Sequence, residues 1–150
     1  MQANAYLFFS GNCEEAFNRY QAVLGGQMLA MLRGTGTPAE AHLPPGWAEK
    51  ILHACLDLGG TMLMGSDAPP NCPAGTPGGF SVNVSVDTPE EAERVFAALS
   101  EGGEVKMPIA PTFWAQRFGM LVDRYGTPWM VNCVLPACAD LGTETAEPVA

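Results

Sequence analysis

An internal repeat constrains the fold of this chain more than any other feature of its sequence. The segment DLGGTMLM at 57–64 shares Asp, Gly, Thr and Met, at the same spacing, with DRYGTPWM at 123–130. The two copies lie 123 − 57 = 66 residues apart. Self-similarity at a fixed spacing indicates that a supersecondary unit is used more than once. We therefore expect two halves with similar structure.

Two amphipathic segments give a second match. Residues 89–103 follow Thr88 as an expected cap, begin with proline and carry Glu91 at capping-box spacing. Asn12 is the expected cap of residues 13–26, and the two caps are 88 − 12 = 76 residues apart. We predict one helix in each half, with apolar stripes at Cys13, Ala16, Phe17, Tyr20 and Leu24, and at Ala92, Val95, Phe96 and Leu99.

The two offsets differ by 76 − 66 = 10 residues, which indicates an insertion in the first half. Residues 35–47 contain three prolines and scattered small residues, so we interpret them as an inserted loop. Coincidence between short strings is the alternative, and the agreement of two separate matches on one loop argues against it. Strands are predicted at 3–9, 27–33, 50–58, 61–67, 80–86, 104–110, 114–123 and 128–135.

These elements predict an α+β fold built from two βαβββ modules. We expect a single domain over 1–135, and the Pro- and Gly-rich segment 68–79 is the predicted linker. The modules would form a curved mixed sheet around a trough, with the helices on its outer face, and a trough is where a ligand binds. The predicted boundaries are 1–67 for module one, 80–135 for module two and 136–150 for a loose tail.

The strand FSVNVSV at 80–86 supports this arrangement through its alternating pattern. Side chains alternate between the two faces of a strand, so the valines should meet the second helix. The polar row of Ser81, Asn83 and Ser85 should then face the trough. The alternative is that this row faces water, as one face of many antiparallel sheets does.

Composition excludes several classes of partner. The formal net charge of −9 leaves no basic stripe for nucleic acid. No apolar run near the start is long enough to span a membrane. The five cysteines include no CxxC pair, so we expect reduced thiols in a cytoplasmic protein, with Cys72 the most exposed.

Three segments carry a family resemblance: YLFFSGNCEEAFNRYQAVLGG, HACLDLGGTMLMGSD and TFWAQRFGMLVDRYGTPWMVN. They resemble the PhnB-like branch of the glyoxalase, bleomycin-resistance and dioxygenase superfamily, also called the vicinal oxygen chelate superfamily. The resemblance covers 6–133 and implies a glyoxalase-like fold of paired βαβββ modules around a ligand trough. Because members of this superfamily often form dimers, it also implies a homodimer.

Metal-dependent members of the superfamily hold a cation with His and Glu side chains on four strands. The resemblance places these positions at Ala5, Met64, Ser81 and Met130, none of which is His or a carboxylate. A divalent cation of this kind needs imidazole or carboxylate ligands. His53 and Asp57 lie four residues apart on one predicted strand, about 13 Å, too far to share one ion. We therefore expect no metal and no cofactor.

The leading functional hypothesis is metal-independent binding of a small molecule in the trough between the modules. Polar residues on the trough-facing strands would bind the ligand, and apolar residues would shape the cavity. The predicted polar residues are Ser66, Ser81, Asn83 and Asn132, and the predicted apolar residues are Met64, Trp114, Phe118 and Met130.

Two other functions stay open. The first is an enzyme of the same superfamily, a lyase, isomerase or dioxygenase that uses unexpected metal ligands, or a metal-free catalyst with His53 or Asp67 in acid–base work. The second is an interaction module whose trough is filled by its own side chains or by a partner chain. The resemblance also implies the description demethylubiquinone methyltransferase. The chain lacks the Gly-rich strand-to-helix turn of an ordinary adenosylmethionine-binding domain, which argues against that activity.

Overall fold

The computed structural model describes residues 1–136, and these residues form two compact units. The first unit comprises Met1–Gly79 together with Tyr125–Thr127, and the second comprises Phe80–Arg124 and the chain from Pro128 onward. Apart from Pro136, the predicted tail lies outside the described residues, and so does Cys138.

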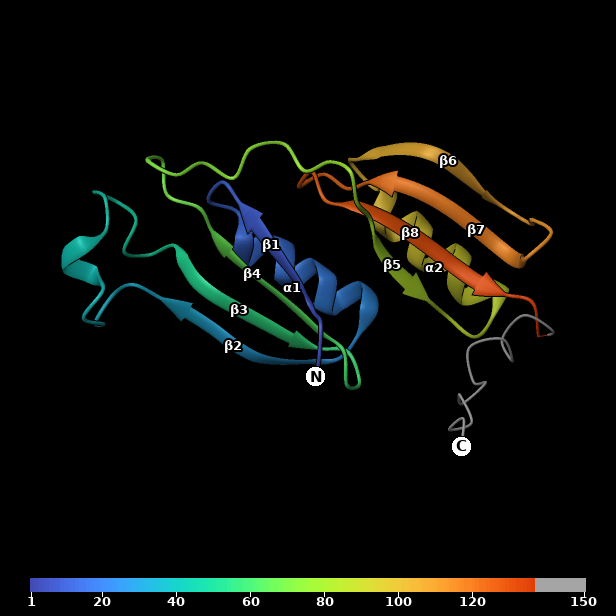
Figure 1. The fold of residues 1–150 in the computed structure, drawn as a ribbon, viewed down its shortest axis with the longest axis horizontal. Helices are drawn as coiled ribbons and strands as arrows, with labels where there is room; N and C mark the ends of the chain where they lie inside the picture. The colour runs from blue at the N-terminus through green and yellow to red at the C-terminus, as the bar shows by residue number, and fades with distance from the viewer. Residues whose placement is uncertain (137–150) are drawn as a thin grey trace, which may run out of the picture. The chain divides into compact units, whose positions relative to one another are not determined.

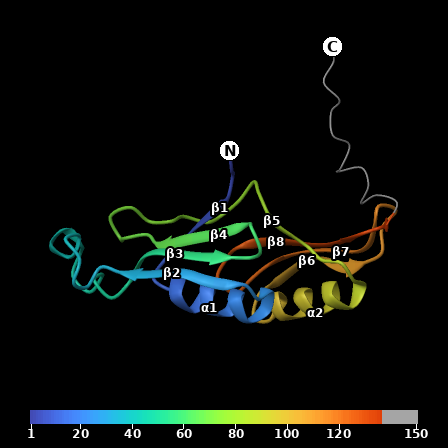
Figure 2. The ribbon, with the colours of Figure 1, turned by 90° about the horizontal axis from the view of Figure 1, so that it is seen from below.

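The first unit is a four-stranded mixed sheet with one helix (Figure 1). Its strand order is β1-β4-β3-β2, with β1 parallel to β4 and the other pairs antiparallel. The helix packs along one face of this sheet, as Figure 2 shows. The elements are β1 (Ala5–Phe9), α1 (Cys13–Leu24), β2 (Gln27–Arg33), β3 (Ile51–Asp57) and β4 (Met62–Asp67).

The predicted inserted loop connects β2 to β3. It holds no strand, as expected, but it contains one turn of 3-10 helix, η1 (Glu40–His42). The backbone of Thr35 donates to the carbonyl of Ala48 at 2.9 Å, which closes the base of the loop.

The second unit repeats the same architecture. Its strand order is β5-β8-β7-β6, with β5 parallel to β8, and α2 packs against β7, β8 and β6. This order matches that of the first sheet strand for strand, so the predicted α+β fold of paired βαβββ modules is confirmed. The elements are β5 (Val82–Ser85), α2 (Pro89–Ser100), β6 (Glu104–Ala110), β7 (Ala115–Val122) and β8 (Pro128–Val134).

The register of the first strand in each unit corrects one part of the predicted repeat. In β1 the residue beside Met64 is Tyr6, and in β5 the residue beside Met130 is Asn83, so these strands correspond at 83 − 6 = 77. The expected pair of Ala5 and Ser81 is therefore wrong: Ala5 lies beside buried Leu63, and Ser81 precedes β5.

The physical reason is the loop before each helix. The helices begin 89 − 13 = 76 residues apart, as predicted. In the first unit, however, residues 10–12 separate the strand register from α1, whereas in the second unit only Asp87 and Thr88 do so. Gly11, in the longer loop, has a φ of 103°. That left-handed backbone suits glycine.

The two helices differ in how they begin. The side chain of Thr88 accepts a hydrogen bond from the backbone of Glu91 at 3.2 Å, which confirms the predicted cap of α2. The other half of the predicted capping box is not formed, because the Glu91 carboxylate accepts from Arg94 instead. The predicted Asn12 cap of α1 is wrong, since its side chain makes no capping hydrogen bond.

The apolar stripes of both helices are buried against their own sheets. All four residues predicted in α2 are buried, and in α1 the prediction fails only at the last position, where Val23 is buried in place of Leu24. In the first unit, Phe17 and Tyr20 pack with Phe9 through edge-on and tilted ring contacts.

Candidate functional site

Close packing of α1 defines the two faces of the first sheet. A Cβ atom on Gly65 would lie 2.7 Å from the Phe17 ring, so Gly65 and its neighbour Leu7 face the helix. Alternation then places the flanking side chains on the opposite face. We call this the helix-distal face of the first sheet, defined by Tyr6, Phe8, His53, Met64 and Ser66.

His53 and Tyr6 form a pair on this face. The Tyr6 hydroxyl lies 3.2 Å from Nδ1 of His53, and the two rings stack with centroids 5.8 Å apart. The pair gives His53 a hydrogen-bond partner that orients its ring. Catalysis by His53 stays a prediction.

Asp67, the other predicted acid–base residue, is engaged with the backbone. Oδ1 accepts from the backbone N–H groups of Gly11 and Cys13, each at 3.0 Å, and Oδ2 accepts from Ile51 at 2.9 Å. This buried carboxylate thus supplies the cap of α1 that was expected from Asn12. Its contacts give Asp67 a structural role, and its acid–base work stays a prediction that these contacts do not favour.

The second sheet also has two faces, set by α2. A Cβ atom on Gly119 would lie 2.5 Å from the Phe96 ring, so Gly119 and Val131 face the helix. The helix-distal face of the second sheet is defined by Asn83, Ser85, Phe118, Met130 and Asn132. Four of these five residues belong to the predicted site. Ser81 lies outside the strand, and Ser85 was expected only as part of the polar row.

One polar atom on this face is buried without a partner. Oδ1 of Asn132 makes no hydrogen bond with any described residue. Asn132 lies beside Ser85 on one side and Phe118 on the other. Asn83 donates to the Ser85 hydroxyl at 3.0 Å, which leaves the Asn132 carbonyl outside that contact. A buried acceptor without a hydrogen bond costs about 1–3 kcal/mol.

Aromatic side chains border the Asn132 position. Phe118 is buried, and its ring meets that of Trp114 edge-on, with centroids 5.4 Å apart. Trp114 immediately precedes β7 and stays partly exposed. The predicted apolar residues Phe118 and Trp114 therefore lie together, within the same unit as Met130.

The described residues contain no group of three or more His, Cys, Asp and Glu side chains able to hold a metal ion. Burial, reinforced by the charge of Asp67, raises the pKa of Cys13 to about 12. Burial likewise raises the pKa of Cys133. Because a thiolate is the nucleophilic form, both residues are core thiols. Cys72 is exposed, as predicted.

Tyr6 and Phe8 are not among the predicted site residues. The alternation of exposed and buried positions along β1 would have revealed them, because Leu7 and Phe9 are buried between them. The one-residue error in register hid this pattern by placing Ala5 on the wrong face.

The sequence matches the model of a protein family over residues 2–132, with the description 3-demethylubiquinone-9 3-methyltransferase. The chain belongs to this family. Protein YjdN of Escherichia coli is 34% identical over 142 residues, which cover 89% of this chain and 96% of YjdN. The methyltransferase wording describes the family model, and YjdN carries no named activity.

Solved structures support the same assignment. PA1353 from Pseudomonas aeruginosa is 48% identical, with a TM-score of 0.82 over 89% of this chain and 98% of its own. A PhnB protein from Bacillus cereus is 28% identical, with a TM-score of 0.73 over 89% of this chain and 100% of its own. An enzyme of the glyoxalase/bleomycin resistance/dioxygenase family from Burkholderia phytofirmans shares the fold, with a TM-score of 0.60 at 19% identity. The expected membership of the PhnB-like branch is confirmed.

Within residues 1–136, neither helix is long and apolar enough to cross a membrane. Each contains 12 residues.

Proposed function

We propose that this PhnB-like protein binds a small uncharged molecule on the helix-distal face of the second sheet. The observation that carries the proposal is the buried carbonyl oxygen of Asn132, which has no hydrogen-bond partner among the described residues. Native structures retain few such atoms, and each one needs an explanation. A ligand N–H or O–H group would satisfy this acceptor.

The surrounding side chains suggest the remaining properties of the ligand. Phe118 and Met130 offer apolar and polarisable contact area, while Asn83 and Ser85 offer exposed hydrogen-bonding groups. None of the residues that define this face is charged, so an ionic ligand would lose its hydration without gaining a counter-ion. We therefore infer a neutral compound with an apolar body and at least one hydrogen-bond donor.

The test compares Asn132→Leu with Asn18→Leu, a matched change at an exposed position on α1. A panel of neutral metabolites is screened by thermal shift against the unmodified protein, and hits are measured by calorimetry. Loss of one hydrogen bond should weaken binding of a hit about tenfold in Asn132→Leu. The control should bind as the unmodified protein does.

Stability without ligand gives a second readout. Leucine removes an unsatisfied buried acceptor at nearly constant volume, so Asn132→Leu should melt at the same or a higher temperature. A hit that binds Asn132→Leu and the unmodified protein equally would refute the proposal. Marked destabilisation of Asn132→Leu alone would also count against it, because Asn132 would then be a structural residue.

We also propose a homodimer and a cytoplasmic location. In the described sheets, β2 and β6 are edge strands that pair on one side only. They expose Leu29, Leu32, Val105 and Met107, and unpaired edges of this kind favour pairing with another chain. The four described cysteines are free thiols, which favours a reducing compartment.

A further inference from the structure

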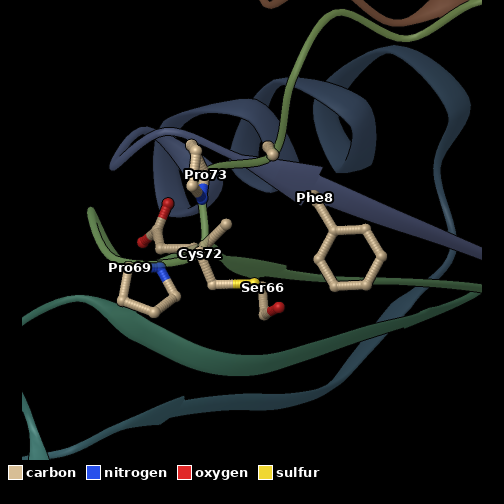
Figure 3. Close-up of a pocket in the computed structure, with 8 residues that line it drawn as sticks. Phe8, Ser66, Pro69, Cys72 and Pro73 are labelled. Atoms are coloured by element: carbon tan, nitrogen blue, oxygen red, sulfur yellow. The ribbon is translucent and has the colours of Figure 1, made fainter.

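The first unit contains a pocket that lies outside the proposed binding face. Its volume is about 260 Å³, and it lies where β4 ends and the following segment folds over the end of β1 (Figure 3). The lining residues are Phe8, Ser66, Asp67, Ala68, Pro69, Cys72, Pro73 and Ala74.

Short-range contacts hold the walls of this pocket in place. The backbone of Ala68 donates to the carbonyl of Phe9 at 2.7 Å, and Cys72 donates to the carbonyl of Pro69 at 2.8 Å. The prolines at 69, 70 and 73 restrict the backbone of the segment that carries Cys72. A wall restrained in this way loses little conformational freedom when a ligand binds.

Ser66 is the feature of the pocket that points to a ligand. Only 9% of its surface is exposed, and its hydroxyl makes no hydrogen bond with any described residue. A hydroxyl can donate one hydrogen bond and accept two, so this side chain can meet either kind of polar group. The neighbouring carboxylate of Asp67 is already engaged with three backbone N–H groups.

Phe8 gives the pocket an aromatic wall. It is 57% exposed, although it lies beside the nearly buried Ser66 in the β1–β4 register. Figure 3 shows the Cys72 side chain directed toward the strand that carries Ser66, with the Phe8 ring beyond it. Such a ring favours a second ring stacked or placed edge-on against it.

We propose that this pocket is a separate binding site for a neutral single-ring aromatic compound that bears one O–H or N–H group. The ring would pack on Phe8 and the prolines, and its polar group would hydrogen-bond to Ser66. The volume lies just below the range of about 300–1,000 Å³ that is typical of sites for larger ligands. The Asp67 carboxylate at the wall disfavours anions.

Cys72 supplies a direct readout of occupancy because its thiol is exposed and lines the pocket. The full chain is treated with iodoacetamide in the presence of increasing phenol or indole, and peptide mapping follows modification of Cys72. The proposal expects both probes to slow this modification in proportion to occupancy, while benzoate does not. Unchanged modification with all three probes would overturn it.

Matched variants assign the contacts. Ser66→Ala should weaken phenol binding about tenfold by calorimetry and leave binding of toluene, which has no polar group, unchanged. Phe8→Ala should weaken both, whereas Phe113→Ala, at a phenyl group of the second unit that is 89% exposed, should weaken neither. Equal phenol binding by Ser66→Ala and the unmodified protein would refute the role of Ser66.

The outcome is independent of the proposed function. Asn132→Leu lies in the other unit and should retain phenol binding here, so failure at one site leaves the other open to its own test.

Discussion

Asp67 shows how much structure a single buried carboxylate organises in this protein. It accepts hydrogen bonds from the loop before α1, from the first residue of α1 and from the first residue of β3. In Asp67→Asn one oxygen becomes an NH2 group, which cannot accept, so at least one buried N–H loses its partner. We expect the free energy of unfolding to fall by about 1–3 kcal/mol in urea titrations.

Asp57→Asn is the matched control. Asp57 also accepts from two backbone N–H groups, those of Gly59 and Gly60, but in an exposed turn where water can replace it. Its replacement should cost less than about 1 kcal/mol. Equal losses in the two variants would contradict the structural role of Asp67.

At the scale of elements, the two helices test whether a cap depends on residue type or on surroundings. Thr88 caps α2 with its own side chain, whereas Asn12 precedes α1 without doing so. We expect Thr88→Ala to lower the free energy of unfolding by about 1 kcal/mol. Asn12→Ala should change it by less than half of that. Chemical denaturation of the two variants under one set of conditions checks this, and a larger loss in Asn12→Ala would contradict it.

At the scale of the whole molecule, the proposed homodimer is a question of which sheet edge is covered. Sedimentation velocity should give a mass close to twice the 15.9 kDa of one chain. Leu32→Lys and Met107→Lys place a charge on the two exposed edge strands, β2 and β6. The substitution at the pairing edge should shift the protein toward monomer. A monomer throughout the micromolar range would contradict the proposal.

Repeated local patterns made much of the fold predictable. The stripe in α2, its Thr88 cap and the bounds of β2 and β6 all depend on neighbours in the sequence, and all are confirmed. The register of β1 was not predictable to one residue, because it depends on the length of the loop before the helix. Asn83, Phe118, Met130 and Asn132 were predictable because alternation within a strand assigns its faces.

By itself, the sequence determined that the chain contains two copies of one βαβββ unit, because helix and strand periodicity and glycine turns are local properties. Only the tertiary structure decided that Asp67 caps α1, that Tyr6 lies beside Met64 and that the Asn132 carbonyl is buried without a partner. Each of these features joins residues far apart in the chain. Such contacts depend on how the strands are aligned in three dimensions, which local patterns do not specify.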